Sequence, residues 1–405
     1  MNSLPLLTPR KTPPQAEAAE RAPTGFALFN LGFRPFYLLA ALCAAGLLPL
    51  WVAQYTMGIL PGNYVNGPAW HAHEMVFGFA AAVVTGFLFT AGRNWTGLAT
   101  PSGTTLAGFS LLWLAGRILM LTGPAPVAAG VDTLFLPLVA LALGRILYRA
   151  GNRRNYFLLA ILLVLTLFNA LFHLAANGMV GIGPNLPVRW ALYLLMVLVA
   201  AMGGRVIPFF TANALPRLNQ YQRPWLDKIA IAMLILALVS AAADAPGYVV
   251  APLCLVAAIV HTIRLAGWRP DAVLRKPILW VLHLAYAWIP VGLAMLGLAA
   301  LGYVAGVFAW HAFAVGALGM VTIGMMTRTS RGHTGSPLLA GRADVASYVL
   351  VLCAGLTRVG IPLLVPHFYL GAVVLSGTLW SIAFLIFAIS YGPLLCRPRR
   401  DGKPG

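Results

Sequence analysis

Residues 70–75 read Trp-His-Ala-His-Glu-Met, which places two histidines and a glutamate side by side at the start of an apolar stretch. Imidazole and carboxylate groups bind metal ions and transfer protons, so chemistry is first expected here. His71 and His73 are two residues apart, which in a regular helix separates them by about 200° around the axis. They could therefore face two different sites, one on each side of the helix. Glu74 lies on the same face as His71 and could accept the free ring N–H of a ligating imidazole.

The composition is that of a membrane protein. The chain has 405 residues, 60% of them apolar and only 9% charged, whereas soluble domains carry about 25% charged residues. A bilayer-spanning helix needs about 20 mostly apolar residues. Twelve stretches are predicted to span the bilayer: 35–56, 69–91, 104–122, 126–148, 156–177, 188–211, 226–243, 247–267, 277–299, 303–326, 344–364 and 368–395.

The basic residues predict how these spans are oriented. The net charge of +18 does not indicate nucleic-acid binding, because the basic residues lie in short loops between apolar stretches. With the N-terminus in the cytoplasm, all but three of the 27 Lys and Arg residues fall on the cytoplasmic side. We therefore expect residues 1–24 to form a disordered cytoplasmic tail, 25–396 a single twelve-helix domain and 397–405 a basic cytoplasmic tail. The four cysteines are far apart and form no CxxC motif, so neither a disulfide framework nor a thiolate metal site is expected.

This orientation places four histidines at one depth. His71, His73, His173 and His311 all fall in the predicted outer third of the membrane. Polar side chains inside a bilayer are costly, so such a group predicts a functional site. Imidazole suits haem iron, copper and zinc, and Glu74 is the single carboxylate we assign to this depth. A haem or copper site is therefore favoured over calcium or magnesium.

The other histidines are more scattered. His283 falls in the inner half of the ninth span, and His333 in the cytoplasmic loop after the tenth. Both could belong to a second site on the inner side, or to a path for protons or electrons. His261 and His367 lie near the predicted membrane surfaces, where solvation is the simplest expectation.

Several candidates also have purely structural interpretations. Arg34 and Arg205 could anchor helix ends by snorkelling, or pair with haem propionates. His173 could hydrogen-bond between helices, and the outer histidines could simply pack. Glu74 could be a proton carrier instead of a partner of a metal ligand.

A repeat is suggested by the motif Trp-His-Ala, which occurs at Trp70 and again at Trp310. The midpoint of this spacing is Trp190, so the three tryptophans open the second, sixth and tenth spans. This pattern predicts three arcs of four helices, an arrangement that resembles the core of haem–copper oxidases at the level of fold. The copper-site motif of those oxidases is absent, so a closely similar binuclear centre is not expected.

Five long motifs carry a specific resemblance: LGFRPFYLLA, WHAHEMVFGFAAAVVTGFLFTAGRNWTG, GGRVIPFFTANAL, HLAYAWIP and HAFAVGALGMVTIGMMTRTSRGHTG. Together they resemble the NnrS family over nearly the whole chain after residue 25. The resemblance implies a bacterial inner-membrane protein with twelve helices, associated with haem, copper, denitrification and nitric oxide stress. It implies cofactor roles for the residues in these motifs: His71, His73, Glu74, His283, His311 and His333. Ser336 departs from the family pattern, which often has Arg there.

The preferred hypothesis is a membrane protein that binds haem, expected to be of b type, with copper as a possible second metal. Such a protein would bind, process or protect against nitric oxide. His71 and His311 are the first expected ligands, with His73 and His173 serving a neighbouring haem or a copper. Turnover would make the protein a haem oxidoreductase with an unidentified electron donor, and Glu74 its proton carrier. A sensor or metal-handling protein would bind haem without turnover. The alternative class is a proton-coupled transporter or channel that uses the same histidines and Glu74.

Overall fold

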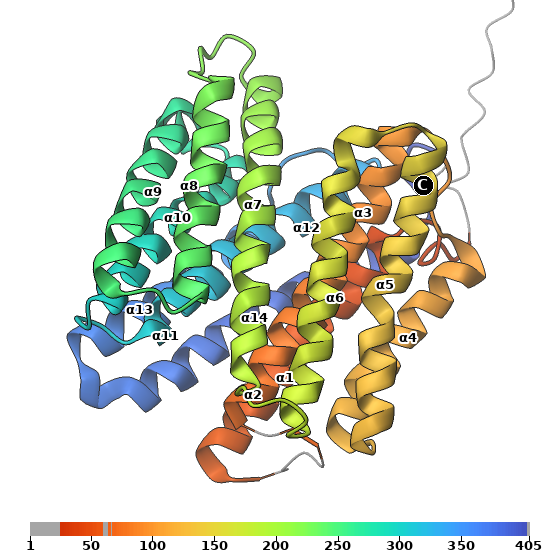
Figure 1. The fold of residues 1–405 in the computed structure, drawn as a ribbon. Helices are drawn as coiled ribbons and strands as arrows, with labels where there is room; N and C mark the ends of the chain where they lie inside the picture. The colour runs from red at the N-terminus through yellow and green to blue at the C-terminus, as the bar shows by residue number, and fades with distance from the viewer. Residues whose placement is uncertain (1–24, 60–63, 66, 403–405) are drawn as a thin grey trace, which may run out of the picture.

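The computed structural model describes residues 25–59, 64–65 and 67–402. The predicted tail over 1–24 and the last three residues lie outside this part of the chain. Within the described residues all regular structure is helical, and twelve helical stretches are long and apolar enough to cross a bilayer. Figure 1 shows them packed side by side as one bundle. The predicted all-α polytopic fold is confirmed.

Ten of the twelve stretches are built around single α-helices, and the second and tenth consist of three pieces. The α-helices are α1 (Phe33–Met57), α2 (Gly67–His73), α3 (Ala81–Thr96), α4 (Gly103–Thr122), α5 (Ala125–Arg149), α6 (Tyr156–Ala176), α7 (Asn185–Ala214), α8 (Pro224–Ala242), α9 (Gly247–Gly267), α10 (Pro277–Ala300), α11 (Gly306–His311), α12 (Met320–His333), α13 (Arg342–Leu364) and α14 (Tyr369–Cys396). Two π-helical segments, η1 (Glu74–Ala80) and η4 (Ala312–Gly319), complete the second and tenth spans. Short 3₁₀ turns are η2 (Arg153–Asn155), η3 (Pro270–Val273) and η5 (Pro366–Phe368).

The tenth span differs from its predicted bounds. It continues to His333 instead of ending near residue 326, so the prediction that His333 lies in a loop is wrong. The polar last turns stay helical because they pack against other helices. Arg331 donates hydrogen bonds to the Tyr391 hydroxyl at 2.8 Å and to Asp344 Oδ2 at 2.7 Å.

The helix contacts describe a closed ring of spans around a few inner ones, and the division into three arcs of four stays a prediction. Neighbouring spans pack in chain order, and α14 closes the ring by packing against α1. The second, sixth and tenth spans lie inside, since α7 contacts α2 and η1 on one side and η4 on the other. Their most apolar windows are 78%, 61% and 61% buried, compared with 61% for α10, 56% for the last span and 28% for α8. The three spans that carry Trp70, Trp190 and Trp310 near their first turns are therefore among the most buried of the bundle.

The two ends of the described chain meet on one side of the bundle. The Ala27 amide donates to the Cys396 carbonyl at 2.9 Å. Arg34 Nη1 donates to the carbonyls of Leu395 and Arg397 at 2.8 and 2.7 Å. We call this the terminal side and the opposite one the far side. An even number of spans requires both ends on one side; that this side faces the cytoplasm stays a prediction.

The two π-helical segments support a local repeat. Each lies at a Trp-His-Ala motif: η1 begins four residues after Trp70, and η4 begins at the alanine of the second motif, two residues after Trp310. In the sixth span, where Trp190 replaces the motif's tryptophan, α7 is helical throughout without such a segment. Single π turns inside α-helices are frequent at functional sites, because they redirect side chains. The Trp-His-Ala motif and its π-helical segment thus occur together at the far-side ends of the second and tenth spans.

Candidate functional site

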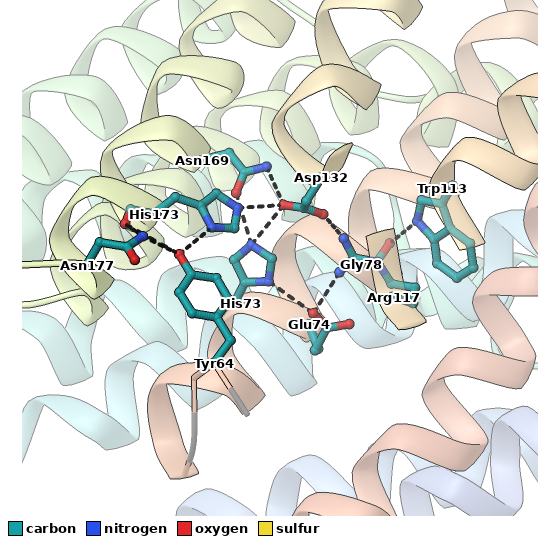
Figure 2. Close-up of polar contacts among 10 residues, drawn as sticks. All are labelled: Tyr64, His73, Glu74, Gly78, Trp113, Arg117, Asp132, Asn169, His173 and Asn177. Atoms are coloured by element: carbon teal, nitrogen blue, oxygen red, sulfur yellow. Dashed lines mark hydrogen bonds and ion pairs between the residues drawn. The ribbon is translucent and has the colours of Figure 1, made fainter. Parts of the chain in front are cut away.

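A buried cluster of polar side chains lies where the second to fifth spans meet near the far side (Figure 2). We call it the polar cluster. Its members are Tyr64, His73, Glu74, Arg117, Asp132, Asn169 and His173. His73 ends α2 and Glu74 opens η1, while α4 and α5 supply the arginine and the aspartate. Asn169 and His173 are one turn apart on α6, so they face the same neighbours.

One guanidinium joins two carboxylates in this cluster. Arg117 Nη1 lies 2.7 Å from Glu74 Oε1, and Arg117 Nη2 forms an ion pair with Asp132 Oδ1. The exposed fractions are 5% for Arg117, 0% for Glu74 and 3% for Asp132. Burial of an ion is tolerated when it is paired, so these three residues stabilise one another. The carboxylates outnumber the guanidinium, which leaves one negative charge for other cations to balance.

His73 connects the two carboxylates. Its Nδ1 lies 3.1 Å from Glu74 Oε1, and its Nε2 lies 2.9 Å from Asn169 Oδ1 and 3.2 Å from Asp132 Oδ2. An ionised carboxylate only accepts hydrogen bonds, so Nδ1 carries a hydrogen that it donates to Glu74. The Nε2 atom then points toward the centre of the cluster.

His173 approaches the same carboxylate from α6. Its Nε2 lies 3.0 Å from Asp132 Oδ2, and its Nδ1 lies 3.1 Å from the Tyr64 hydroxyl. That hydroxyl also accepts a hydrogen bond from Asn177 Nδ2 at 2.8 Å. One ligand atom each from His73, Asp132 and His173 lie within 4.8 Å of one another, which is a spacing that a metal ion can bridge.

The polar cluster corrects two interpretations. Glu74 is not the single carboxylate at this depth, since Asp132 lies beside it. Glu74 also pairs with His73 and not with His71, because the helix widens into η1 directly after His73 and Arg117 holds the carboxylate on that side. Asp132 and Arg117 are charged residues within predicted spans, and that signal could have identified them.

A second feature, an apolar cavity of about 520 Å³, lies on the other side of α2. We call it the histidine cavity, because His71 and His311 both line it. As the angular separation predicted, His71 and His73 point to different surroundings, the first to this cavity and the second to the polar cluster. The His71 ring stacks on Trp51 with centroids 4.1 Å apart, and Arg189 and Arg358 also reach the wall. Ligand pockets commonly have volumes of about 300–1,000 Å³ and a few polar groups in an apolar lining.

Four polar atoms of the residues in this wall are buried without a partner among the described residues: His71 Nδ1, Arg189 Nε, Arg358 Nη1 and Trp380 Nε1. Unsatisfied buried donors and acceptors are costly, so these atoms make the residues around the cavity unusual and the wall a candidate binding site. His311 differs from His71 in that its Nδ1 has a hydrogen-bond partner: it donates to the Val307 carbonyl at 2.8 Å. This bond leaves the His311 Nε2 lone pair available for a ligand.

Comparison with known proteins identifies the family. The family model described as NnrS protein matches residues 27–399. The chain belongs to the NnrS family. None of the curated proteins compared with it matches the chain. As a member of this family with twelve candidate spans, it is a multi-pass membrane protein.

The remaining predicted site residues of this NnrS-family protein lie toward the terminal side. Arg205 and His333 line one cavity of about 410 Å³, together with Arg154. Arg205 donates to Asn155 Oδ1 at 3.2 Å, and the His333 ring contacts Phe33 with centroids 5.6 Å apart. The structure thus brings two predicted cofactor-binding residues together, away from both far-side sites.

Arg34, His283 and His261 line neither of the two cavities. Arg34 is buried and donates hydrogen bonds to the backbone carbonyls of Leu395 and Arg397, so it packs against the last helix and not in a cavity wall. His283 is buried and its Nδ1 donates to the Leu279 carbonyl of its own helix at 3.1 Å. His367 is exposed, as expected, but the prediction of a solvated His261 is wrong. His261 is fully buried and bonds the Tyr286 hydroxyl at 2.6 Å, because α9 turns this face toward α10.

Close packing around Glu74 makes Gly78 a sensitive position in this NnrS-family protein. A Cβ atom at Gly78 would lie 3.0 Å from Arg117 Nη1 and 3.2 Å from Glu74 Oε2. We expect Gly78→Ala to reduce the free energy of unfolding by about 1–3 kcal/mol, the usual effect of overpacking. Thermal unfolding in detergent measures it. Gly130→Ala is the matched control, since a Cβ there meets nothing within 4 Å; equal effects at both positions would contradict this explanation.

Proposed function

We propose that this protein binds haem in the histidine cavity and that it binds, processes or protects against nitric oxide in the bacterial inner membrane. The observation that supports this most is that His71 and His311 line one apolar cavity together with the guanidinium-bearing residues Arg189 and Arg358. Membership of the NnrS family supports the association with haem and nitric oxide. Copper and an electron donor are further expectations of the same proposal.

The residues of the cavity fit haem chemically. Imidazole is a common axial ligand of haem iron, and either His71 or His311 offers one. The guanidinium groups of Arg189 and Arg358 suit the carboxylate groups of a porphyrin, since such pairs form charge-assisted hydrogen bonds. The apolar remainder of the wall suits the porphyrin face. When bound, haem supplies an iron that takes a diatomic ligand at an open position or carries an electron.

The residues themselves fix the geometry of this site. The Val307 carbonyl fixes the His311 ring through Nδ1, and Trp51 holds the His71 ring by stacking. Ligation by one histidine would leave a position for nitric oxide, whereas ligation by both would favour electron transfer. Glu74 does not line the cavity, although its neighbours Met75 and Val76 do. Its proposed role as proton carrier therefore requires transfer across η1 from the polar cluster.

A visible absorption spectrum tests the proposal first. The purified, detergent-solubilised protein, expressed with added haem, is expected to show a Soret band. We expect the band of the reduced protein to shift when nitric oxide is added, because an open iron position binds this ligand. A Soret band that nitric oxide leaves unchanged would support a bis-histidine, electron-carrying haem. Absence of any haem band would overturn the proposal.

A proton-coupled transporter or channel is the second candidate, and the polar cluster favours it. Glu74, Arg117 and Asp132 are buried charges within spans, and such residues often mark ion or proton paths. This candidate predicts a colourless protein that moves protons when reconstituted in liposomes. Haem binding without proton movement would exclude it.

A further inference from the structure

The ring nitrogens of His73 face more acceptors than a neutral imidazole can satisfy. Nδ1 faces Glu74 Oε1, while Nε2 faces Asn169 Oδ1 and Asp132 Oδ2. Asn169 is oriented by its own Nδ2, which donates to Asp132 Oδ2 at 2.7 Å. A neutral imidazole has one N–H, which Glu74 uses. The Nε2 atom therefore needs a second positive partner, which is either a proton or a metal ion.

His173 presents a second ring nitrogen to the same place. Its Nδ1 faces the Tyr64 hydroxyl, which can accept a hydrogen, so its Nε2 can point a lone pair at Asp132 Oδ2. The other oxygen of that carboxylate, Oδ1, is held by Arg117. His73 Nε2, His173 Nε2 and Asp132 Oδ2 thus lie close together. The second polar atom of each side chain contacts Glu74, Tyr64 and Arg117, respectively.

We propose that His73 Nε2, Asp132 Oδ2 and His173 Nε2 bind a first-row transition-metal ion. This site is separate from the histidine cavity and does not depend on the proposed haem. It deepens the expectation of copper under the proposed function, because it adds Asp132 to His73 and His173 as a third ligand. Two imidazoles and one carboxylate are the ligands of zinc sites and of the facial triad of non-haem iron. The ligand separations of 3.0 and 3.2 Å correspond to an angle of about 95° at a metal held at about 2.1 Å from each ligand.

The surrounding residues support a cation here. Histidine ligands of metal sites usually donate their second N–H to a carboxylate or another oxygen, and Glu74 and Tyr64 accept in this way. Glu74, Asp132 and Arg117 together carry one net negative charge in an apolar surrounding. Three ligands leave open positions for water or a small molecule, as in catalytic metal sites.

Zinc is the probe for the experiment, because it is redox-inert and can be counted apart from haem iron. The full-length protein is loaded with Zn(II) in detergent, desalted and analysed for zinc, with haem measured on the same sample. We expect about one tightly held zinc ion per chain and loss of that zinc in Asp132→Asn and His173→Gln. Glu74→Gln keeps the ligands, so we expect binding to weaken by about 10–100-fold without disappearing.

His261→Gln is the matched control, because it also removes a buried, hydrogen-bonded imidazole but lies between α8, α9 and α10. We expect it to retain zinc. If the ligand variants fold poorly, the wild-type protein still provides a test, since Zn(II) should raise its unfolding temperature. No zinc retention and no stabilisation in the wild type, or equal retention in all variants, would overturn the site and indicate a protonated His73. Haem content reports separately on the proposed function.

Discussion

His71→Ala is expected to lose most of its haem while remaining in the membrane. Removing a residue that merely supports a metal ligand often weakens binding about 10–100-fold, so removing a ligand should lower haem content by more than about tenfold. His71 lines the histidine cavity and has a buried ring nitrogen that lacks a partner among the described residues, which is why the effect should be largest there. The measurement is haem per chain from the absorption of the pyridine complex, at equal expression.

The comparison with two other histidines makes this expectation specific. His311→Ala should also lose haem, or convert its spectrum from two histidine ligands to one, because His311 lines the same cavity. His367→Ala is the matched control, since His367 is exposed and should leave haem content unchanged. Normal haem content in both the His71 and the His311 variant would show that haem, if bound, lies elsewhere, and the cavity around His333 would be the next place to look.

The fold was largely predictable because hydropathy and charge are properties of single segments. The span over 247–267, the weakest by composition, is present with those bounds as α9. The tenth span was predicted too short because its last turns are polar, and a polar helix end resembles a loop until its partners are known. Those partners, Asp344 and Tyr391, lie in other spans.

The candidate sites were predictable only in part. The angular separation of His71 and His73 on one helix is a local property, and it correctly indicated two different sites. The contact of Asp132 with both His73 and His173 depends on how α5 and α6 pack against the second span, which no local pattern specifies. The same limit explains why Glu74 was assigned to the wrong histidine: η1 is an interruption of the regular helix that the angular argument assumed.

Arg117→Met should give the largest loss of stability among single changes in the polar cluster. The substitution keeps an unbranched side chain but leaves Glu74 and Asp132 as two buried carboxylates without their shared guanidinium. Removing one partner of a buried ion pair typically costs about 3–5 kcal/mol, because the remaining charge stays desolvated. We expect a reduction of that size in the free energy of unfolding, measured by thermal or denaturant unfolding in detergent. Arg269→Gln is the control: Arg269 pairs with Asp271 on the exposed surface, where such pairs contribute little.

A compensated variant separates charge from packing as the origin of this loss. In Arg117→Met combined with Glu74→Gln and Asp132→Asn, the cluster has no ionised carboxylate, so most of the stability should return. Recovery would show that Arg117 acts by balancing the two carboxylates. A loss as large as in the single variant would instead show that its packing on Trp113, with the guanidinium carbon 5.8 Å from that ring, is what matters. The first result would also show that the carboxylates of the polar cluster need a cation beside them, which is the property on which the proposed metal site depends.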